Sequence, residues 1–260
     1  MTGKRNQAMV IGWLYPELMS TYGDRGNVIV LTNRCRWRGI PVRTVPIDFA
    51  TREPEIRGCD IILGGGAQDR QQGIVISDLR KNKKTVLTEL FTQGTPGLFV
   101  CGSPQLLGHY YMTADAEKLE GLGIFDMVSR HFGRRRPRCI GNLLADIGNV
   151  YRLDGLSYAP TIIGFENHGG RTYLGPGVTP FAKVIRGFGN NGEDGTEGAV
   201  YRNCIATYSH GPFLSKNPHI ADWLITTSLE IKYGKPVKLD ALDDSLEWQA
   251  HRSMFKRLVK

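Results

Sequence analysis

The chain has 260 residues, of which 41% are hydrophobic and 22% are charged, and its formal net charge is +8. This composition excludes a disordered chain, so we expect one globular domain over residues 1–260. No apolar run approaches the ~20 residues that a membrane span needs, and no cleavage-site pattern follows the first residues. These features predict a cytoplasmic protein.

The cysteines and the charge runs limit the kinds of ligand further. The five cysteines are scattered, and no two form a Cys-x-x-Cys pair, which is typical of reduced thiols and argues against a disulfide framework or a zinc site. We therefore expect no metal. Positive charge is concentrated at 80–84, 130–138 and 251–260, but no nucleic-acid motif accompanies these runs. We expect no nucleic-acid partner and favour an anionic substrate or an acidic protein.

The first half of the chain alternates apolar runs of strand length with helical stretches. In chain order, the spacing predicts a strand at 9–15, a helix at 28–38, strands at 42–47 and 60–63, a long helix at 69–93 and a strand at 98–100. This α/β order implies a mostly parallel sheet with helices on both faces. Ligands of such a sheet bind at the carboxyl ends of its strands.

The second half has a different character. From 123 to 210 the segments are shorter and rich in Gly and Asn, which predicts antiparallel strands added to the sheet. A helix is predicted at 217–233, with Asn217 as its N-cap and Gly234 as its stop. The run at 187–192 fits the spacing GxGxxG, but no helix follows it, so we predict a hairpin loop. A phosphate-binding GxxxxGK[ST] motif is absent, so any ATP-driven chemistry is expected on a partner.

Cys101 stands where an apolar strand meets a tight turn and a helix, in the sequence GLFVCGSPQLLG. Such an elbow aims a sulfur out of the sheet, with a helix N-terminus that favours the thiolate. An isolated cysteine is more often a small core residue, so the surrounding residues must decide.

A cysteine nucleophile needs a base and backbone donors for the oxyanion. The expected donors are the amide of Gly102 and an amide of the turn that contains Gly65 and Gly66, although those glycines also suit a plain tight turn. Among the histidines His210 is the preferred base, because an apolar strand precedes it and a turn follows it, as at Cys101.

Several motifs together carry a resemblance to a known family. Beside the cysteine elbow they are GGGxQD at 64–69, TYGDRGN at 21–27, GFENHGGRT at 164–172, GFGNN at 187–191 and SHGP at 209–212. They resemble class I glutamine amidotransferases of the cobyric acid synthase-like branch and, more narrowly, the glutaminase subunits of lipid II isoglutaminyl synthase. The similarity runs from about residue 11 to 234. The chain has no room for the synthetase domain of cobyrinate synthases, which favours a stand-alone subunit.

The resemblance implies a single-domain class I amidotransferase-like fold and a reaction. L-glutamine would be hydrolysed through a thioester on Cys101, with His210 moving the protons. Ammonia would pass to a Mur-ligase-like synthetase subunit, which would use ATP and Mg²⁺ to amidate the α-carboxylate of D-glutamate in lipid II, the peptidoglycan precursor. No cofactor is expected in this chain. Arg138 matches a family position implicated in handling glutamine, although it would also serve to close a basic loop, and Gln105 is a second expected substrate contact.

The sequence departs from the family pattern at two places. Many class I enzymes have a glutamate two residues after the histidine, where this chain has Pro212. A third catalytic member must then come from Glu166 or Asp24, of which Glu166 is slightly preferred. The second departure is Ser103-Pro104, where relatives usually have glycine and an aromatic residue, and it puts the shape of the elbow in question.

Two alternative functions stay open from the sequence. The chain could feed another ATP-dependent amidase, such as a cobyrinate-type synthetase, or it could be an inactive amidotransferase-like binding module. The presence of the cysteine, the histidine and both turns argues against the inactive module. The basic tail or helix at about 236–260 interleaves apolar and cationic residues, so it fits a peripheral contact with the inner membrane surface or, as preferred, packing on its own domain.

Overall fold

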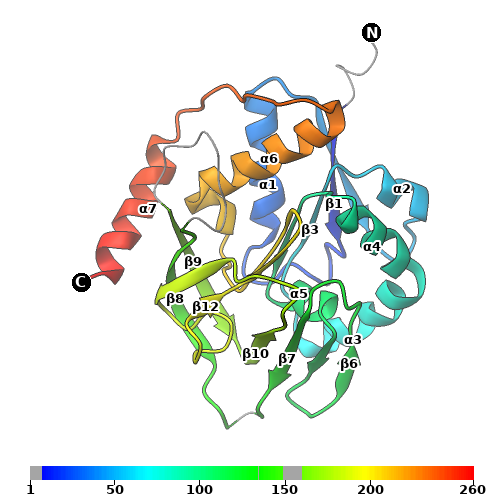
Figure 1. Ribbon diagram of the computed structural model, residues 1–260, viewed down its shortest axis with the longest axis vertical. Helices are drawn as coiled ribbons and strands as arrows, with labels where there is room; N and C mark the ends of the chain where they lie inside the picture. Colours follow the sequence, from blue (N-terminus) through cyan, green and yellow to red (C-terminus); the bar gives the residue numbers. More distant parts are fainter. Residues whose placement is uncertain (1–7, 134, 149–159) are drawn as a thin grey trace.

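A computed structural model describes residues 8–133, 135–148 and 160–260. A six-stranded sheet lies at its centre, in the order β13-β14-β4-β3-β1-β2 (Figure 1). Neighbouring strands are parallel except for the edge pair β13 and β14. The strands are β1 (Met9–Leu14), β2 (Val42–Ile47), β3 (Ile61–Gly64), β4 (Gly97–Val100), β13 (Ala199–Tyr201) and β14 (Cys204–Thr207). The predicted parallel sheet is confirmed.

Helices cover both faces of this sheet, so its central strands β3 and β4 are buried on both sides. In β4, Phe99 belongs to one apolar cluster while Leu98 and Val100 belong to the other, as the two-residue period of a strand requires. The Phe99 face packs against α2 (Glu53–Arg57), α3 (Asp69–Asp78), α4 (Lys84–Thr92) and α5 (Gly102–Leu107). The opposite face packs against α1 (Arg25–Trp37), the short helix η2 (Phe213–Lys216) and α6 (Pro218–Tyr233).

Residues 110–197 form two further sheets of four strands. We expected the strands of 123–210 to join the central sheet, and among them only β13 and β14 do so. One sheet contains β5 (Tyr110–Met112), β6 (Lys118–Glu120), β7 (Met127–His131) and β10 (Gly170–Leu174). The other contains β8 (Cys139–Asp146), β9 (Thr161–His168), β11 (Ala182–Arg186) and β12 (Thr196–Glu197). The GxGxxG run lies between the antiparallel strands β11 and β12, so the predicted hairpin loop is confirmed.

The single long helix predicted at 69–93 is interrupted by a π-helical turn, η1 (Leu79–Lys83). Lys83 is fully buried there, and its Nζ donates to Asp78 Oδ2 at 2.5 Å. The same carboxylate oxygen accepts a hydrogen bond from the Tyr15 hydroxyl at 2.6 Å. The extra residue of the π turn brings the ammonium of Lys83 to its buried partner, which a regular helix pattern does not predict.

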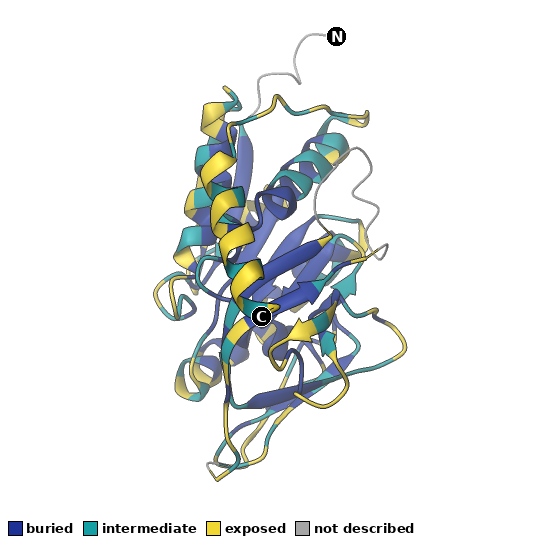
Figure 2. Cartoon of the chain, turned by 90° about the vertical axis from the view of Figure 1, so that its left-hand side faces the viewer, coloured by how far each residue is buried: buried dark blue, intermediate teal, exposed yellow. Residues whose placement is uncertain are grey.

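The basic tail forms α7 (Ser245–Leu258), which packs against β8, β9 and η2. His251 is the buried residue of this helix. Its Nε2 lies 2.9 Å from Thr161 Oγ1, and its Nδ1 lies 2.7 Å from the carbonyl oxygen of Lys216. Figure 2 shows that the outer face of α7 is exposed. The tail thus packs on its own domain, whereas a membrane contact through that outer face stays a prediction. Within the described ranges, no helix has the length and apolarity to cross a bilayer.

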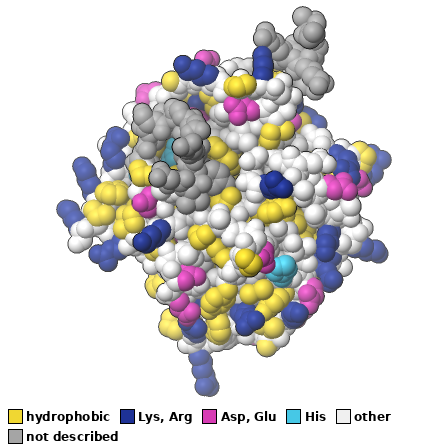
Figure 3. All heavy atoms as spheres, viewed as in Figure 1, with side chains coloured by type: hydrophobic (Ala, Val, Ile, Leu, Met, Phe, Trp, Pro, Cys, Tyr) yellow, Lys and Arg dark blue, Asp and Glu magenta, His cyan; other side chains and the backbone are white. Residues whose placement is uncertain are grey.

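On the face shown in Figure 3, Lys and Arg are interspersed with Asp and Glu and do not join into one basic stripe. A continuous stripe would be the electrostatic footprint of a nucleic-acid-binding protein.

Candidate active site

Cys101 occupies a strained turn between β4 and α5. Its backbone has φ 54° and ψ −96°, a conformation that residues with a side chain rarely adopt. Its amide donates to the carbonyl oxygen of Thr207 at 2.8 Å, which fixes the turn to β14. The predicted elbow is therefore present, and the strain is located at the residue whose sulfur must be presented.

Close packing around Cys101 requires glycine at two positions, Gly102 and Gly66. A Cβ on Gly102 would lie 2.8 Å from the amide nitrogen of Ala67, and one on Gly66 would lie 2.7 Å from His210 Cε1. The Gly66 position is also within 3.4 Å of Cys101 Cβ, so Cys101 and His210 approach each other across this glycine. The three predicted segments thus meet at the carboxyl edge of the sheet.

Ser103, one of the departures from the family pattern, is accommodated at the elbow. Its hydroxyl donates to the carbonyl oxygen of Gly65 at 2.6 Å, and a Cβ on Gly64 would lie only 2.5 Å from that hydroxyl. The serine therefore ties the cysteine turn to the upstream glycine turn.

His210 is fully buried, and its contacts identify its carboxylate partner as Asp24. The ring Nδ1 lies 3.0 Å from both carboxylate oxygens of Asp24. Burial lowers the pKa of His210, but the negative charge of Cys101 and the hydrogen bond with Asp24 outweigh it and raise this pKa to about 10. This environment therefore favours the imidazolium form of His210. The edge of the Tyr22 ring also contacts the imidazole, with the ring centroids 5.1 Å apart.

Two contacts hold the Asp24 segment against the His210 segment. A Cβ on Gly26 would lie 2.1 Å from Pro212 Cγ, so the start of α1 packs directly on this proline. The side-chain oxygen of Asn27 accepts a hydrogen bond from the Leu214 amide at 2.9 Å. Pro212, which cannot orient an imidazole itself, thus helps to place the carboxylate that does.

Glu166, the slightly preferred third member, is in another place. Its carboxylate accepts hydrogen bonds from the amides of Phe188 at 2.6 Å and Gly189 at 2.9 Å. One of its oxygens also lies 3.6 Å from His168 Nε2. The geometry favours Asp24 over Glu166 as the carboxylate beside His210, because Glu166 belongs to the β8–β9 sheet, where it holds the hairpin loop.

The amide of Gly66, an expected oxyanion donor, is already bonded within the protein. The amide of Gly66 donates to Asp24 Oδ2 at 2.7 Å, so it is not free to stabilise an oxyanion. Ala67 follows it, lines the cavity beside Cys101 and places its amide nitrogen next to Gly102. The sequence analysis missed Ala67, because the GGG run drew attention to the glycines and the partner of each amide is visible only in the fold.

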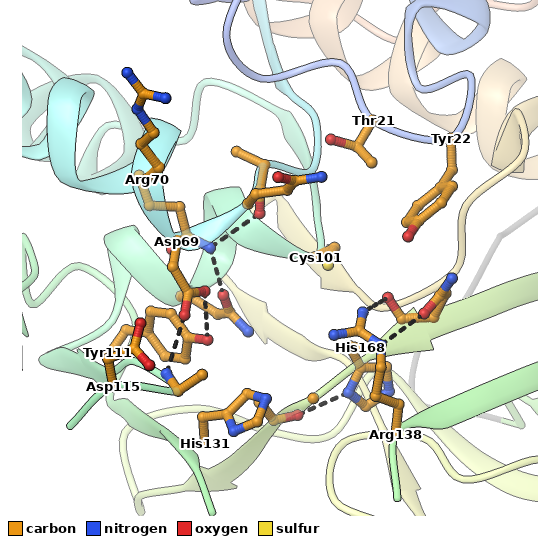
Figure 4. Close-up of a pocket in the computed structure, with 18 residues that line it drawn as sticks. Thr21, Tyr22, Asp69, Arg70, Cys101, Tyr111, Asp115, His131, Arg138 and His168 are labelled. Carbon is orange, nitrogen blue, oxygen red and sulfur yellow. Dashed lines mark hydrogen bonds between the residues drawn. The ribbon is translucent and has the colours of Figure 1, made fainter. Parts of the chain in front are cut away.

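A cavity of about 400 Å³ opens beside Cys101. Figure 4 shows the sulfur of Cys101 facing it among Tyr22, Asp69 and His168. Its volume is in the range of small-molecule sites. The charged side chains that line it are Asp69, Arg70, Asp115 and Arg138. It therefore offers groups of both signs, which a zwitterionic amino acid requires.

The two predicted substrate contacts differ in what the structure allows them to do. Arg138 lies at the exposed rim of the cavity, where Nε and Nη2 donate to the side-chain and main-chain oxygens of Asn167 at 3.0 and 2.9 Å. These bonds orient its guanidinium. Gln105 is buried, and its amide donates to the Tyr208 hydroxyl and accepts from Gln72 Nε2, both at 3.0 Å. Gln105 thus supports the cavity wall, because its amide is already paired within the protein.

Among the residues that the structure describes, no group of three or more His, Cys, Asp or Glu side chains is arranged to hold an ion.

Comparison with known proteins identifies the family of the chain. Residues 10–218 match the CobB/CobQ-like glutamine amidotransferase domain. The chain is 40% identical over 241 residues to the lipid II isoglutaminyl synthase (glutamine-hydrolyzing) subunit GatD of Staphylococcus aureus, covering 93% of this chain and 92% of that protein. The Streptococcus pneumoniae subunit of the same name is 36% identical, with 91% and 86% covered.

A solved structure supports the fold alone. The Trypanosoma brucei CTPS glutaminase domain with bound acivicin has a TM-score of 0.56 at 12% identity, covering 91% of this chain and 99% of that one. The family model covers most of the chain, and two relatives above 30% identity match nearly all of it. The chain therefore belongs to the CobB/CobQ-like glutamine amidotransferases, as its motifs predicted.

Proposed function

We propose that this chain is the glutamine-hydrolysing subunit of a lipid II isoglutaminyl synthase. The observation that carries the proposal is the contact of Asp24 with His210, across Gly66 from Cys101, at the wall of an amino-acid-sized cavity. The named relatives supply the choice of acceptor.

In the first half of the reaction, the Cys101 thiolate attacks the side-chain carboxamide carbon of L-glutamine. A carbon–sulfur bond forms, and the amides of Gly102 and Ala67 are the donors placed to stabilise the oxyanion. The His210 imidazolium then gives its Nε2 proton to the leaving nitrogen, the carbon–nitrogen bond breaks and ammonia departs. Asp24 keeps the proton of Nδ1 in place throughout.

In the second half, water hydrolyses the thioester. Neutral His210 takes a proton from water as the water oxygen attacks, the carbon–sulfur bond breaks, and glutamate leaves with the thiolate restored. Arg138 is the guanidinium placed to bind the α-carboxylate of glutamine at the rim. This chain needs no cofactor for either step.

The ammonia passes to a Mur-ligase-like synthetase subunit in this proposal. That subunit would bind ATP and Mg²⁺ and activate the α-carboxylate of D-glutamate in the lipid II stem peptide for amidation. We expect the complex in the cytoplasm, where ATP is available, with the membrane-anchored acceptor presented at the inner surface.

Reconstitution tests the proposal. The chain and the synthetase subunit of the same organism, with ATP, Mg²⁺, lipid II and glutamine, should yield lipid II with an amidated D-glutamate, detected by mass spectrometry. Cys101→Ala should abolish amidation from glutamine, and added ammonium chloride should restore it. Amidation of a corrin carboxylate in place of lipid II would favour the cobyrinate-type alternative. Undiminished glutamine-dependent amidation by Cys101→Ala would overturn the mechanism.

A further inference from the structure

Gln72 is a buried polar side chain that the proposed reaction steps leave without a role. It lies in the first turn of α3, with 2% of its surface exposed. Its side-chain nitrogen Nε2 donates to the carbonyl oxygen of Ala67 at 3.1 Å and to Gln105 Oε1 at 3.0 Å. Its Oε1 has no hydrogen-bond partner among the described residues. Since a buried polar group costs free energy unless it is paired, the two bonds of the nitrogen are what this side chain contributes.

The first bond ends on Ala67, whose amide is one of the two donors for the oxyanion. A Cβ on Gly102 would lie 2.8 Å from the amide nitrogen of Ala67 and 3.2 Å from Gln72 Nε2. Ala67 and Gln72 both line the cavity that Cys101 faces. The side-chain amide of Gln72 therefore lies next to both oxyanion donors.

The segment that carries Ala67 needs restraint from outside. Three glycines, at 64–66, precede Ala67, and glycine leaves the backbone more free than any other residue does. The amide of Thr21 donates to the carbonyl oxygen of Gly66 at 3.1 Å. Because the C=O and N–H of one trans peptide group point in opposite directions, this bond sets the direction of the Ala67 N–H. Gln72 holds the next carbonyl, that of Ala67, so the donor is fixed on both sides.

The second bond ties Gln72 to the helix that carries the other donor. Gln105 lies on α5, which begins at Gly102 directly after Cys101. The Gln105 amide also donates to the Tyr208 hydroxyl at 3.0 Å, so α5 is held to the segment that leads to the catalytic histidine. Gln72 thus joins the loop of one oxyanion donor to the helix of the other. Such donors stabilise an oxyanion only when both lie within hydrogen-bond reach of the same oxygen.

We infer that Gln72 is the positioning residue of the oxyanion hole. Its side-chain amide holds Ala67 and α5 so that the amides of Ala67 and Gly102 converge on one oxygen beside Cys101. This inference rests on the proposed function, because an oxyanion forms here only when a carboxamide or a thioester is attacked. Gln72 acts through Ala67 in this role and not on glutamine itself. Its loss is therefore felt when the negative charge develops and not when glutamine binds.

Two variants at neighbouring positions of α3 test the inference. Gln72→Met keeps the length of the side chain and removes the donor, whereas Gln71→Met makes the same change at a residue outside the lining of the cavity. Glutamate release by the full chain, with the synthetase subunit of the same organism present, gives kcat and KM. Gln72→Met should lower kcat at least about tenfold and leave KM within about twofold, because a displaced donor weakens only the transition state. Gln71→Met should keep both values within about twofold of wild type.

Two further measurements separate positioning from general damage. Iodoacetamide alkylates a thiolate by displacing iodide and forms no oxyanion, so Cys101 of Gln72→Met should react within about twofold of the wild-type rate. Tyr208→Phe frees the Gln105 amide while leaving the bond to Ala67 in place, so it should lower kcat less than Gln72→Met does. If thermal unfolding shows that Gln72→Met does not fold, Gln72→Leu also lacks the donor and carries the same expectation.

The outcomes distinguish this inference from the proposed function. If the wild-type chain with its synthetase subunit releases no glutamate, the proposed function fails. If the wild type is active but Gln72→Met keeps its kcat, or shows a raised KM with an unchanged kcat, Gln72 does not position the oxyanion hole. An equal loss of kcat in Tyr208→Phe would mean that the effect runs through Gln105, and slower alkylation in step with kcat would place it at Cys101 and His210. Either result would overturn the inference.

Discussion

His210 and His219 are both buried, with 0% and 1% of their surface exposed, yet their pKa values move in opposite directions. Burial lowers the pKa of each. At His210 the charges of Cys101 and Asp24 reverse this effect and raise the pKa to about 10. At His219 burial is reinforced by the neighbouring His251 and lowers the pKa to about 3.

The difference lies in the partners of each ring. His219 stacks on Trp248 with ring centroids 5.3 Å apart, and neither of its ring nitrogens has a hydrogen-bond partner among the described residues. His210 has a carboxylate at 3.0 Å. The His219 region therefore uses its histidine as a flat apolar-like side chain that packs α6 against α7, whereas the Cys101 region keeps a charge inside the protein. Burial alone does not mark a catalytic histidine.

The largest expected effect is at the charged site. Cys101→Ala removes the nucleophile and should abolish glutamine hydrolysis while the fold survives, and His210→Ala should lose a similar amount of activity. The double variant should be little worse than either single variant, because the pair acts as a unit. Glutamate release measures the rates, and a glutamine-like chloroketone should label Cys101 alone. Labelling of Cys139 instead, with Cys101→Ala fully active, would contradict the assignment.

The next effect separates the two candidate carboxylates. Asn at position 24 can still accept the bond from the Gly66 amide, but its NH₂ group would then face His210 Nδ1 and favour the wrong tautomer. Asp24→Asn should therefore lower kcat by roughly two or more orders of magnitude with little change in KM. Glu166→Gln is the matched control and should keep most of the activity. Near-normal turnover in both would mean that Cys101 and His210 work as a dyad.

The stability of the protein in acid tests the low pKa of the buried His219. The pKa of His219 is lower in the folded protein than in the unfolded chain, so its contribution to stability is complete above the unfolded value of 6.5 and is lost as the pH falls towards 3. The loss amounts to roughly 1.4 kcal/mol per pH unit in that window. His219→Phe keeps the stacking ring, so its free energy of unfolding should fall less steeply between pH 6.5 and pH 4.

Urea titrations of both proteins at pH 7 and pH 4.5 measure the slope. Some slope will remain in the variant, because burial also lowers the pKa of His251. Glutamine hydrolysis at pH 7 should not change. Parallel stability profiles of wild type and variant would show that His219 does not titrate in this window.

The smallest effect concerns the attachment of α7. His251→Ala removes the bonds to Thr161 and to the Lys216 carbonyl, which should cost about 1–3 kcal/mol of stability. Leu246→Ala, at a side chain that is 74% exposed, should change stability by less than about 0.5 kcal/mol. Thermal unfolding measures both. Weaker liposome binding by His251→Ala without a lower Tm would instead favour the membrane contact.

Local signals were sufficient to predict the parts of the site that depend on one segment. The strand, turn and helix around Cys101 and the strand before His210 are visible in the sequence, because hydrophobic runs and turn residues are local. The choice between Asp24 and Glu166 was not local. It depends on β9 belonging to a separate sheet and on α1 packing against Pro212. Neither contact produces a hydrophobic period or a motif spacing that could be recognised in the sequence.

The same limit explains the other differences. The π turn at η1 exists because Lys83 pairs with Asp78, five residues away, at a spacing that suits no regular helix face. The engagement of the Gly66 amide by Asp24 depends on a partner 42 positions earlier. The bonding of the Gly66 amide therefore could not be predicted from local sequence patterns.

The contact between Asp24 and His210 has a consequence for how the protein matures. It joins residues 186 positions apart, so the acid is synthesised well before the base. Contacts of such long range form after local structure in most folding reactions. The contact that keeps His210 charged beside Cys101 is therefore assembled late. The rate at which a thiol reagent reacts with Cys101 during refolding would thus report when the segments that carry Asp24 and His210 come together.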